Sequence, residues 1–176
     1  MSNSIMPKVN IQKLTQLGLL FALAVVLMFI EALIPPLPTM PPGVKLGLSN
    51  IVVMYCLFFL DNKSAFTILL LKSVFVFLTR GPTAFLMSIL GGLFSILIII
   101  MLLALKKQQL SYIIISVYAA IAHNMGQLIV SSFLLSSTMA FYYAPILIIS
   151  GVIMGVITGT ILNVMLPAMK RVSFKE

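Results

Sequence analysis

Acidic residues are nearly absent from this chain, which has three Asp or Glu and 11 Lys or Arg among 176 residues. A magnesium site for a diphosphate needs several acidic oxygens, and a Ser–His–Asp hydrolase needs a carboxylate to orient its histidine. Glu31, Asp61 and Glu176 form no Asp-rich pair and no such triad in the sequence. We therefore predict that the chain is not an enzyme.

Cysteine, histidine and tryptophan are equally scarce, with one Cys, one His and no Trp. The lone Cys56 excludes a disulfide within the chain, and one His with one membrane carboxylate does not complete a metal site. Neither a CxxCH haem motif nor a Walker A loop is present. We predict no cofactor, no metal and no ATP hydrolysis. Without Trp, an indole wall for a flat aromatic ligand is also missing.

Long apolar runs dominate what is present. Hydrophobic residues make up 61% of the chain and charged residues 8%, and the mean hydropathy is +1.21. A soluble domain needs a more polar surface. Since a span takes about 20 apolar residues, we predict an all-α integral membrane protein with six transmembrane helices in a single domain, residues 1–176. The predicted spans are residues 11–34, 46–60, 64–79, 83–105, 110–135 and 141–169.

Basic residues are distributed unequally between the two ends of these spans. Cytoplasmic loops carry an excess of Lys and Arg, which predicts that both termini are cytoplasmic. The net charge of +8 then reflects orientation and contact with anionic lipid, so we expect no nucleic-acid partner. The residues assigned to the cytoplasmic side are Lys8, Lys13, Lys63, Lys106, Lys107, Lys170, Arg171 and Lys175.

The remaining ionic residues need a different explanation. Lys72 lies in the middle of an apolar run, and Glu31 is the only carboxylate within a span. Such groups are expensive in a membrane unless they are paired or face a wet cavity. One interpretation is a structural bridge from Glu31 to Lys45, Lys72 or Arg80. The other is an outward-facing pocket, whose surplus of cations would favour an anionic ligand.

Amide and imidazole groups form a second set of candidates. His123 and Gln127 are four residues apart on one helical face, with Asn124 beside them. Interhelical hydrogen bonds contribute roughly 0.5–1 kcal/mol each in lipid, too little to explain three polar groups in one turn, which favours a cavity lining. Asn50 either caps the second helix or reaches the mouth of the pocket. The Pro-rich loop 35–43 is predicted to act as a lid.

Small residues indicate surfaces for close helix packing. Gly18 and Ala22 form a stripe on the face of the first span nearly opposite Glu31. A subunit that docks on a partner protein would show such a stripe, and so would a simple bundle in which this face packs on a neighbouring helix. Glycines recur at four-residue spacing in the last span, which is typical of tight packing between helices. These glycines are Gly151, Gly155 and Gly159.

Two motifs carry a resemblance to a known family. The stretch from Glu31 to PPGVKLGLSN and the motif AHNMGQL resemble the Gx transporter family, also described as heptaprenyl diphosphate synthase component I. That family is similar to the S components of energy-coupling factor (ECF) vitamin transporters. The resemblance implies a six-helix bundle, an outward-facing pocket closed by the loop after the first helix, and a coupling subunit bound at an AxxxA pattern. Gly18 and Ala22 match that pattern in part.

We therefore predict a substrate-binding subunit of an ECF-type importer in the bacterial plasma membrane. Its ligand would be a small anionic metabolite, such as a vitamin or quinone precursor, and its partners a membrane coupling subunit and an ATPase pair. The alternative is a non-transporting subunit that supports quinone or prenyl metabolism, or flavin-linked electron transfer. The predicted binding residues are Glu31, Lys45, Asn50, Lys72, Arg80, His123, Asn124 and Gln127.

Overall fold

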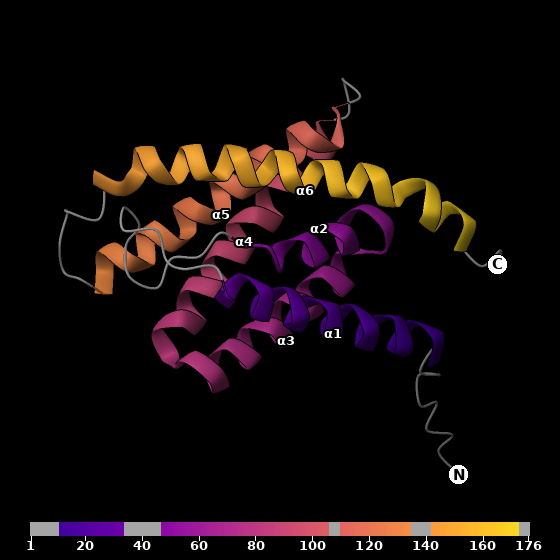
Figure 1. Ribbon diagram of the computed structural model, residues 1–176, viewed down its shortest axis with the longest axis horizontal. Coiled ribbons are helices and arrows are strands. Elements are labelled where there is room, and N and C mark those ends of the chain that lie inside the picture. The colour runs from indigo at the N-terminus through magenta and orange to yellow at the C-terminus, as the bar shows by residue number, and fades with distance from the viewer. Residues whose placement is uncertain (1–10, 34–46, 106–109, 135–141, 173–176) are drawn as a thin grey trace, which may run out of the picture.

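The computed structural model describes residues 11–33, 47–105, 110–134 and 142–172, with side chains up to residue 164. Within these ranges the chain forms six α-helices and no strand (Figure 1). The helices are α1 (Ile11–Leu33), α2 (Asn50–Phe59), α3 (Asn62–Arg80), α4 (Pro82–Ala104), α5 (Tyr112–Leu134) and α6 (Ala144–Val172).

Five of these helices, all except α2, are long and apolar enough to cross a membrane. The chain is therefore a multi-pass membrane protein. Helix α2 has 10 residues, and at 1.5 Å per residue it extends about 15 Å, half of the roughly 30 Å hydrocarbon core. The other helices begin and end within a few residues of the predicted spans. The predicted span 46–60 starts too early, because residues 48 and 49 form a turn before α2.

The helices form a bundle in which α3, α4 and α5 each pack against the helix that follows in sequence. Helix α1 packs against α2 and α3. Figure 1 shows α6 along one edge of the bundle and α1 apart from it, with the start of α1 and the end of α6 at the same end of the molecule.

Helix α2 lies inside the bundle. It contacts α1, α3, α4 and α6, and every residue from Asn50 to Leu57 is buried. A helix that is apolar on all sides is stable when other elements surround it, and the sequence NIVVMYCLFF gives α2 that character. Its one strongly polar residue, Asn50, is thereby carried into the interior.

Two tight turns place α3 between α2 and α4. Asp61 caps α3 by accepting a hydrogen bond from the Ser64 N–H at 2.6 Å. At the other end, Gly81 adopts a φ of +86° and Pro82 occupies the first position of α4, where a missing N–H is tolerated. Arg80 is therefore held at the end of α3 that lies opposite Asp61.

The glycine stripe of α6 lies directly on the backbone of α5. At Gly155, an added Cβ would lie 2.3 Å from the Cα of Val117, a distance that real Cβ atoms do not reach. Gly151 and Gly159 make equivalent approaches to Ile121 and Ile113. Since no side chain separates the two helices along this line, α6 fixes the position of α5 and of the polar groups that α5 carries.

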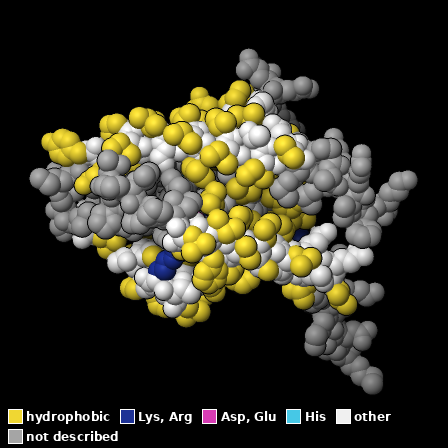
Figure 2. Space-filling view, in the orientation of Figure 1, with side chains coloured by type: hydrophobic (Ala, Val, Ile, Leu, Met, Phe, Trp, Pro, Cys, Tyr) yellow, Lys and Arg dark blue, Asp and Glu magenta, His cyan; other side chains and the backbone are white. Residues whose placement is uncertain are grey.

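The outer surface of the bundle is apolar. Figure 2 shows hydrophobic side chains spread over much of the described part of one face, with few basic groups among them. Leu19 of α1, Leu78 of α3 and Val164 of α6 are all more than two-thirds exposed. Such a surface suits a hydrocarbon environment and leaves the interior for polar groups.

We expect Gly155→Ala to lower the free energy of unfolding by about 1–3 kcal/mol, because the new methyl group must displace the α5 backbone. Gly18→Ala is the matched control. It adds the same atom to a helical glycine with no atom within 4 Å, and should stabilise by about 0.5–1 kcal/mol. Thermal unfolding of both variants in one detergent measures the difference. Equal melting temperatures would contradict the close packing of α6 on α5.

The ion pair between Asp61 and Lys13 predicts a pH-dependent contribution to stability. The hydrogen bond from Lys13, followed by that from the Ser64 N–H, lowers the pKa of Asp61 from 3.8 to about 2. Because the folded-state pKa is the lower one, the stabilisation is present at neutral pH and is lost as the pH falls from 3.8 towards about 2.

Asp61→Asn keeps a good helix cap and removes the charge. The melting temperature of wild type should therefore exceed that of Asp61→Asn at pH 6, by a small margin because the pair is half-exposed. This margin should shrink below pH 4. A margin that is constant with pH would show that the charge contributes nothing.

Candidate functional site

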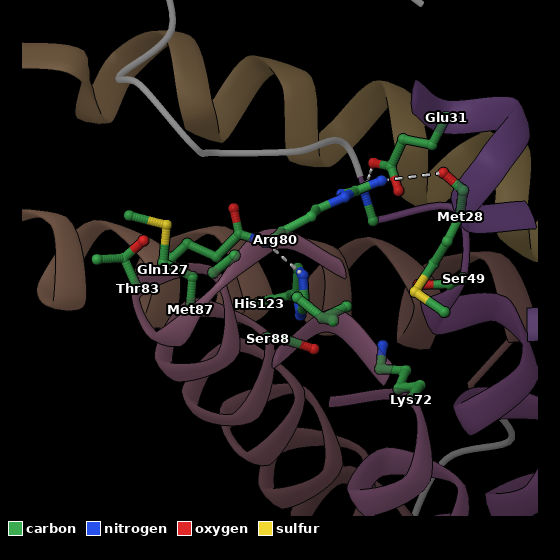
Figure 3. Close-up of a pocket in the computed structure, with 13 residues that line it drawn as sticks. Met28, Glu31, Ser49, Lys72, Arg80, Thr83, Met87, Ser88, His123 and Gln127 are labelled. Carbon is green, nitrogen blue, oxygen red and sulfur yellow. Dashed lines mark hydrogen bonds between the residues drawn. The ribbon is translucent and has the colours of Figure 1, made fainter. Parts of the chain in front are cut away.

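A cavity of about 220 Å³ lies between α1, α3, α4, α5 and the turn that precedes α2 (Figure 3). Most of its polar side chains are buried, and they come from elements far apart in the sequence, as is typical of ligand sites. The lining residues are Met28, Glu31, Gly47, Ser49, Lys72, Val76, Arg80, Thr83, Ala84, Met87, Ser88, His123 and Gln127.

Glu31 and Arg80 lie at the α1 side of the cavity and are both held by backbone groups. The buried carboxylate of Glu31 accepts a hydrogen bond from the Gly47 N–H at 2.5 Å. The Arg80 Nη2 donates to the carbonyl oxygen of Met28 at 3.2 Å, one turn before Glu31 (Figure 3). These two bonds tie the end of α1 to the start of α2 and to the end of α3.

Lys72 reaches the cavity from α3 and is 2% exposed. Its Nζ donates to the Asn50 Oδ1 at 3.4 Å, and the Asn50 Nδ2 donates to the Ser95 Oγ of α4 at 2.8 Å. Because α2 lies inside the bundle, its first residue, Asn50, supplies the amide oxygen that accepts from Lys72. An ammonium group has three donors, so two of them have no hydrogen-bond partner among the described residues.

His123 forms the α5 wall of the cavity together with Gln127, whose Nε2 lies 2.7 Å from the His123 Nε2. Glycines surround the imidazole ring. An added Cβ would lie 2.8 Å from its Cε1 at Gly91 and 3.2 Å from its Cδ2 at Gly47. Gly126, in turn, packs against the backbone of Gly91. These glycines allow α4, α5 and the start of α2 to close around one ring.

Five of the eight predicted binding residues line this cavity, and they come from α1, α3 and α5. They are Glu31, Lys72, Arg80, His123 and Gln127. Asn50 lies behind Lys72 as its hydrogen-bond partner. The cavity therefore brings together polar and charged side chains that the sequence separates by almost 100 residues.

The other two predicted residues are not in the cavity lining. Asn124 is buried and donates to the Leu147 carbonyl oxygen of α6 at 2.8 Å, so it connects two helices. Lys45, like the Pro-rich loop 35–43, lies outside the described residues. Gly18 and Ala22 are exposed on the face of α1 that is turned away from Glu31, as their spacing predicts.

The α4 wall of the cavity was not predicted from the sequence. Thr83, Ala84, Met87 and Ser88 follow the spacing of one helical face and line the cavity together. Such residues are ordinary in any membrane helix. The available signal was the repeat of Ser88 and Ser95, seven residues apart. Ser88 Oγ lies 2.9 Å from Ser73 Oγ, and Ser95 holds the amide behind Lys72.

No salt bridge joins Glu31 to Lys72 or Arg80 within the part of the chain that the structure describes. The ion pair found there, between Lys13 and Asp61, lies at the other end of α3. The direct structural pair between Glu31 and Lys72 is thus not formed. Two cations and one carboxylate share the cavity, each with backbone or amide partners, and the sum of their formal charges is positive.

Two other kinds of site find little support. The N–H groups of residues 50–52 donate to the carbonyl groups of residues 47–49, so the start of α2 does not offer them to an anion. Ser49 makes no capping hydrogen bond and lines the cavity instead. Among the described residues, no three His, Cys, Asp or Glu side chains gather in a way that could hold a metal ion.

Residues 20–165 match the family described as heptaprenyl diphosphate synthase component I. The chain belongs to this family. The match spans every residue that lines the cavity and confirms the family predicted from the two motifs. No curated protein and no solved structure matches the chain. The family name describes one component of a multi-component synthase, and this member is a membrane protein with five helices that could span a bilayer.

We expect Gly47→Ala to be more destabilising than Gly81→Ala. Both glycines have nearly the same positive φ, +85° and +86°, so both variants should lose about 1–2 kcal/mol from backbone strain. Only at Gly47 does the new methyl group also meet His123, at 3.2 Å, while Gly81 has open space. Thermal unfolding of the two variants isolates the His123 contact. A larger loss at Gly81 would contradict this packing.

Proposed function

We propose that this protein is the substrate-binding membrane subunit of an ECF-type importer and that it takes up a small anionic metabolite. The observation that carries the proposal is the cavity in which Lys72 and Arg80 form no salt bridge with a carboxylate of the described residues. A cation that lacks a direct ion-pair partner is costly in a low-dielectric environment. An anionic guest would remove that cost and would be attracted by the surplus positive charge.

The size of the cavity restricts the ligand. Its volume of about 220 Å³ lies below the roughly 300–1,000 Å³ of sites for drug-sized molecules. Its walls provide hydroxyl groups from Ser49 and Ser88 and the thioethers of Met28 and Met87, and no Phe or Tyr among the described residues lines it. These features favour a compact, hydrogen-bonding metabolite over a flat aromatic vitamin.

Transport would require partners, because the sequence has no ATP-binding motif of its own. The exposed face of α1 that contains Gly18 and Ala22 is a suitable docking surface for a membrane coupling subunit. No atom lies within 4 Å of a Cβ added at Gly18, so this face is unoccupied within the described bundle. An ATPase pair bound to the coupling subunit would supply the energy, in the bacterial plasma membrane.

A second candidate function follows from the family description. A component of a heptaprenyl diphosphate synthase would hold a prenyl or quinone enzyme at the membrane without transporting anything. Under this alternative, the polar groups of the interior serve helix packing, as the bond from Asn124 to Leu147 does. The two functions differ in whether the cavity binds a small anion.

We expect Lys72→Met to weaken anion binding strongly while the fold persists. Loss of a charge-assisted hydrogen bond of about 1.5–3 kcal/mol weakens binding roughly 10- to 100-fold. An apolar side chain of similar length also removes a buried charge that lacks a counter-ion, so thermal stability should change little. Native mass spectrometry of the full chain in nanodiscs would detect the bound metabolite in wild type and its loss in the variant.

Lys63→Met is the matched control, because Lys63 is exposed near the opposite end of α3. It removes the same charge and should leave the bound metabolite in place. Two outcomes would refute the importer subunit. One is a wild-type protein that carries only lipid after exposure to a broad set of metabolites. The other is a Lys72→Met protein that unfolds or loses partner enzymes while its small-molecule content is unchanged.

A further inference from the structure

The two cations of the cavity occupy separate positions. Lys72 and Arg80 are eight residues apart on α3, which places their Cα atoms about 12 Å apart along the helix axis. Figure 3 shows the Arg80 side chain extending towards Glu31 and Met28, away from the ammonium group of Lys72. One carboxylate group is therefore poorly suited to bind both cations, and the cavity offers two anion subsites.

Both subsites retain unused donors. Lys72 is fully buried and makes one long hydrogen bond, 3.4 Å to Asn50. Arg80 has five N–H donors, and one of them binds the Met28 carbonyl. Within the described residues, neither side chain makes any other hydrogen bond or any salt bridge, so each can bind an anionic group of a ligand.

Glu31 forms a third subsite of opposite charge. Its carboxylate is 6% exposed and accepts one hydrogen bond from Gly47. A carboxylate accepts about four hydrogen bonds in total, and no cationic side chain of the described residues forms a salt bridge with it. A buried carboxylate with this spare capacity is suited to a donor, most of all to one that carries positive charge.

Charge balance selects one class of ligand. The formal charges of Lys72, Arg80 and Glu31 sum to +1, so a ligand of net charge −1 neutralises the site. A ligand that also pairs each group individually has two anionic groups and one protonated amine. We propose that the cavity binds a small amino dicarboxylate, with one carboxylate at Lys72, the other at Arg80 and the ammonium group at Glu31. This inference rests on the proposed function and specifies its substrate class.

The remaining polar groups fit such a guest. The hydroxyl groups of Ser49 and Ser88 and the His123–Gln127 pair lie along the same walls, and they can accept or donate at the ligand's carboxylates. A ligand that lacks the amine leaves Glu31 buried without a cationic partner. A ligand with a single carboxylate leaves either Lys72 or Arg80 without an anionic partner. The cavity should therefore discriminate strongly against ligands that lack the amine and against ligands that lack the second carboxylate, because unpaired buried charge is costly.

Isothermal titration of the full chain in nanodiscs tests this with three kinds of probe. L-aspartate and L-glutamate have all three charged groups, succinate and glutarate lack the amine, and L-alanine lacks the second carboxylate. We expect one of the two amino dicarboxylates to bind at least ten-fold more tightly than the matching dicarboxylate and than L-alanine. We also expect Glu31→Gln to remove the advantage over the dicarboxylate, while Asp61→Asn, a control carboxylate outside the cavity, preserves it.

The wild-type comparison is decisive even if Glu31→Gln does not fold. Succinate or glutarate binding as tightly as the amino acid, with that binding lost in Lys72→Met, would overturn the amine subsite and leave the anion receptor intact. If none of the probes binds, but native mass spectrometry finds another Lys72-dependent anion, the substrate class is wrong and the receptor stands. If neither is found, the proposed function fails as well.

Discussion

The cost of burying the Lys72 ammonium group within an apolar bundle constrains the arrangement of the helices around it. A cation at this depth requires polar partners or a wet cavity. The short helix α2 supplies the partner, because it starts inside the bundle and its first residue, Asn50, meets Lys72. If α2 were a full-length span, its first residue would lie nearer the bundle surface. Ser95 of α4 then fixes the amide that holds Lys72.

Close backbone contacts determine the shape of the cavity as much as the charges do. Glycines at positions 47, 91 and 126 remove the side chains that would otherwise separate α4, α5 and the start of α2. The imidazole of His123 fills the space that they leave. Because protein interiors are close-packed, a methyl group added at any of these positions would have to displace the ring or a neighbouring backbone. The walls are therefore rigid where the ligand would contact α5.

The sequence is sufficient to predict the helices and the set of charged residues that meet in the interior. It is insufficient to predict which side chain on another helix each polar residue contacts. Hydropathy predicts the spans, and the cost of burying charge selects Glu31, Lys72 and Arg80 from the sequence alone. Helical periodicity gives the angle of a side chain and does not identify the helix that faces it. The sequence therefore does not distinguish Asn124, which contacts α6, from His123, which lines the cavity. The α4 wall was missed for a related reason. Small and weakly polar residues acquire a role only through the charged neighbours that the fold brings to them.

Helix α1 contributes both to the proposed ligand site, through Glu31, and to the proposed docking surface, through Gly18. Thirteen residues separate Gly18 from Glu31, about 20 Å along the helix, and the two lie on different faces, so a ligand and a docked partner would not touch. Communication between them would pass through the orientation of α1 itself. Among the described elements α1 packs mainly on α2 and α3. Gly47 and Arg80 hold the end of α1 that contains Glu31 at the cavity. A ligand that engages Glu31 and Arg80 acts on those bonds directly. Such a ligand would alter partner affinity only if its contacts differ between two orientations of α1, and the bonds at this end of the helix are the contacts best placed to differ.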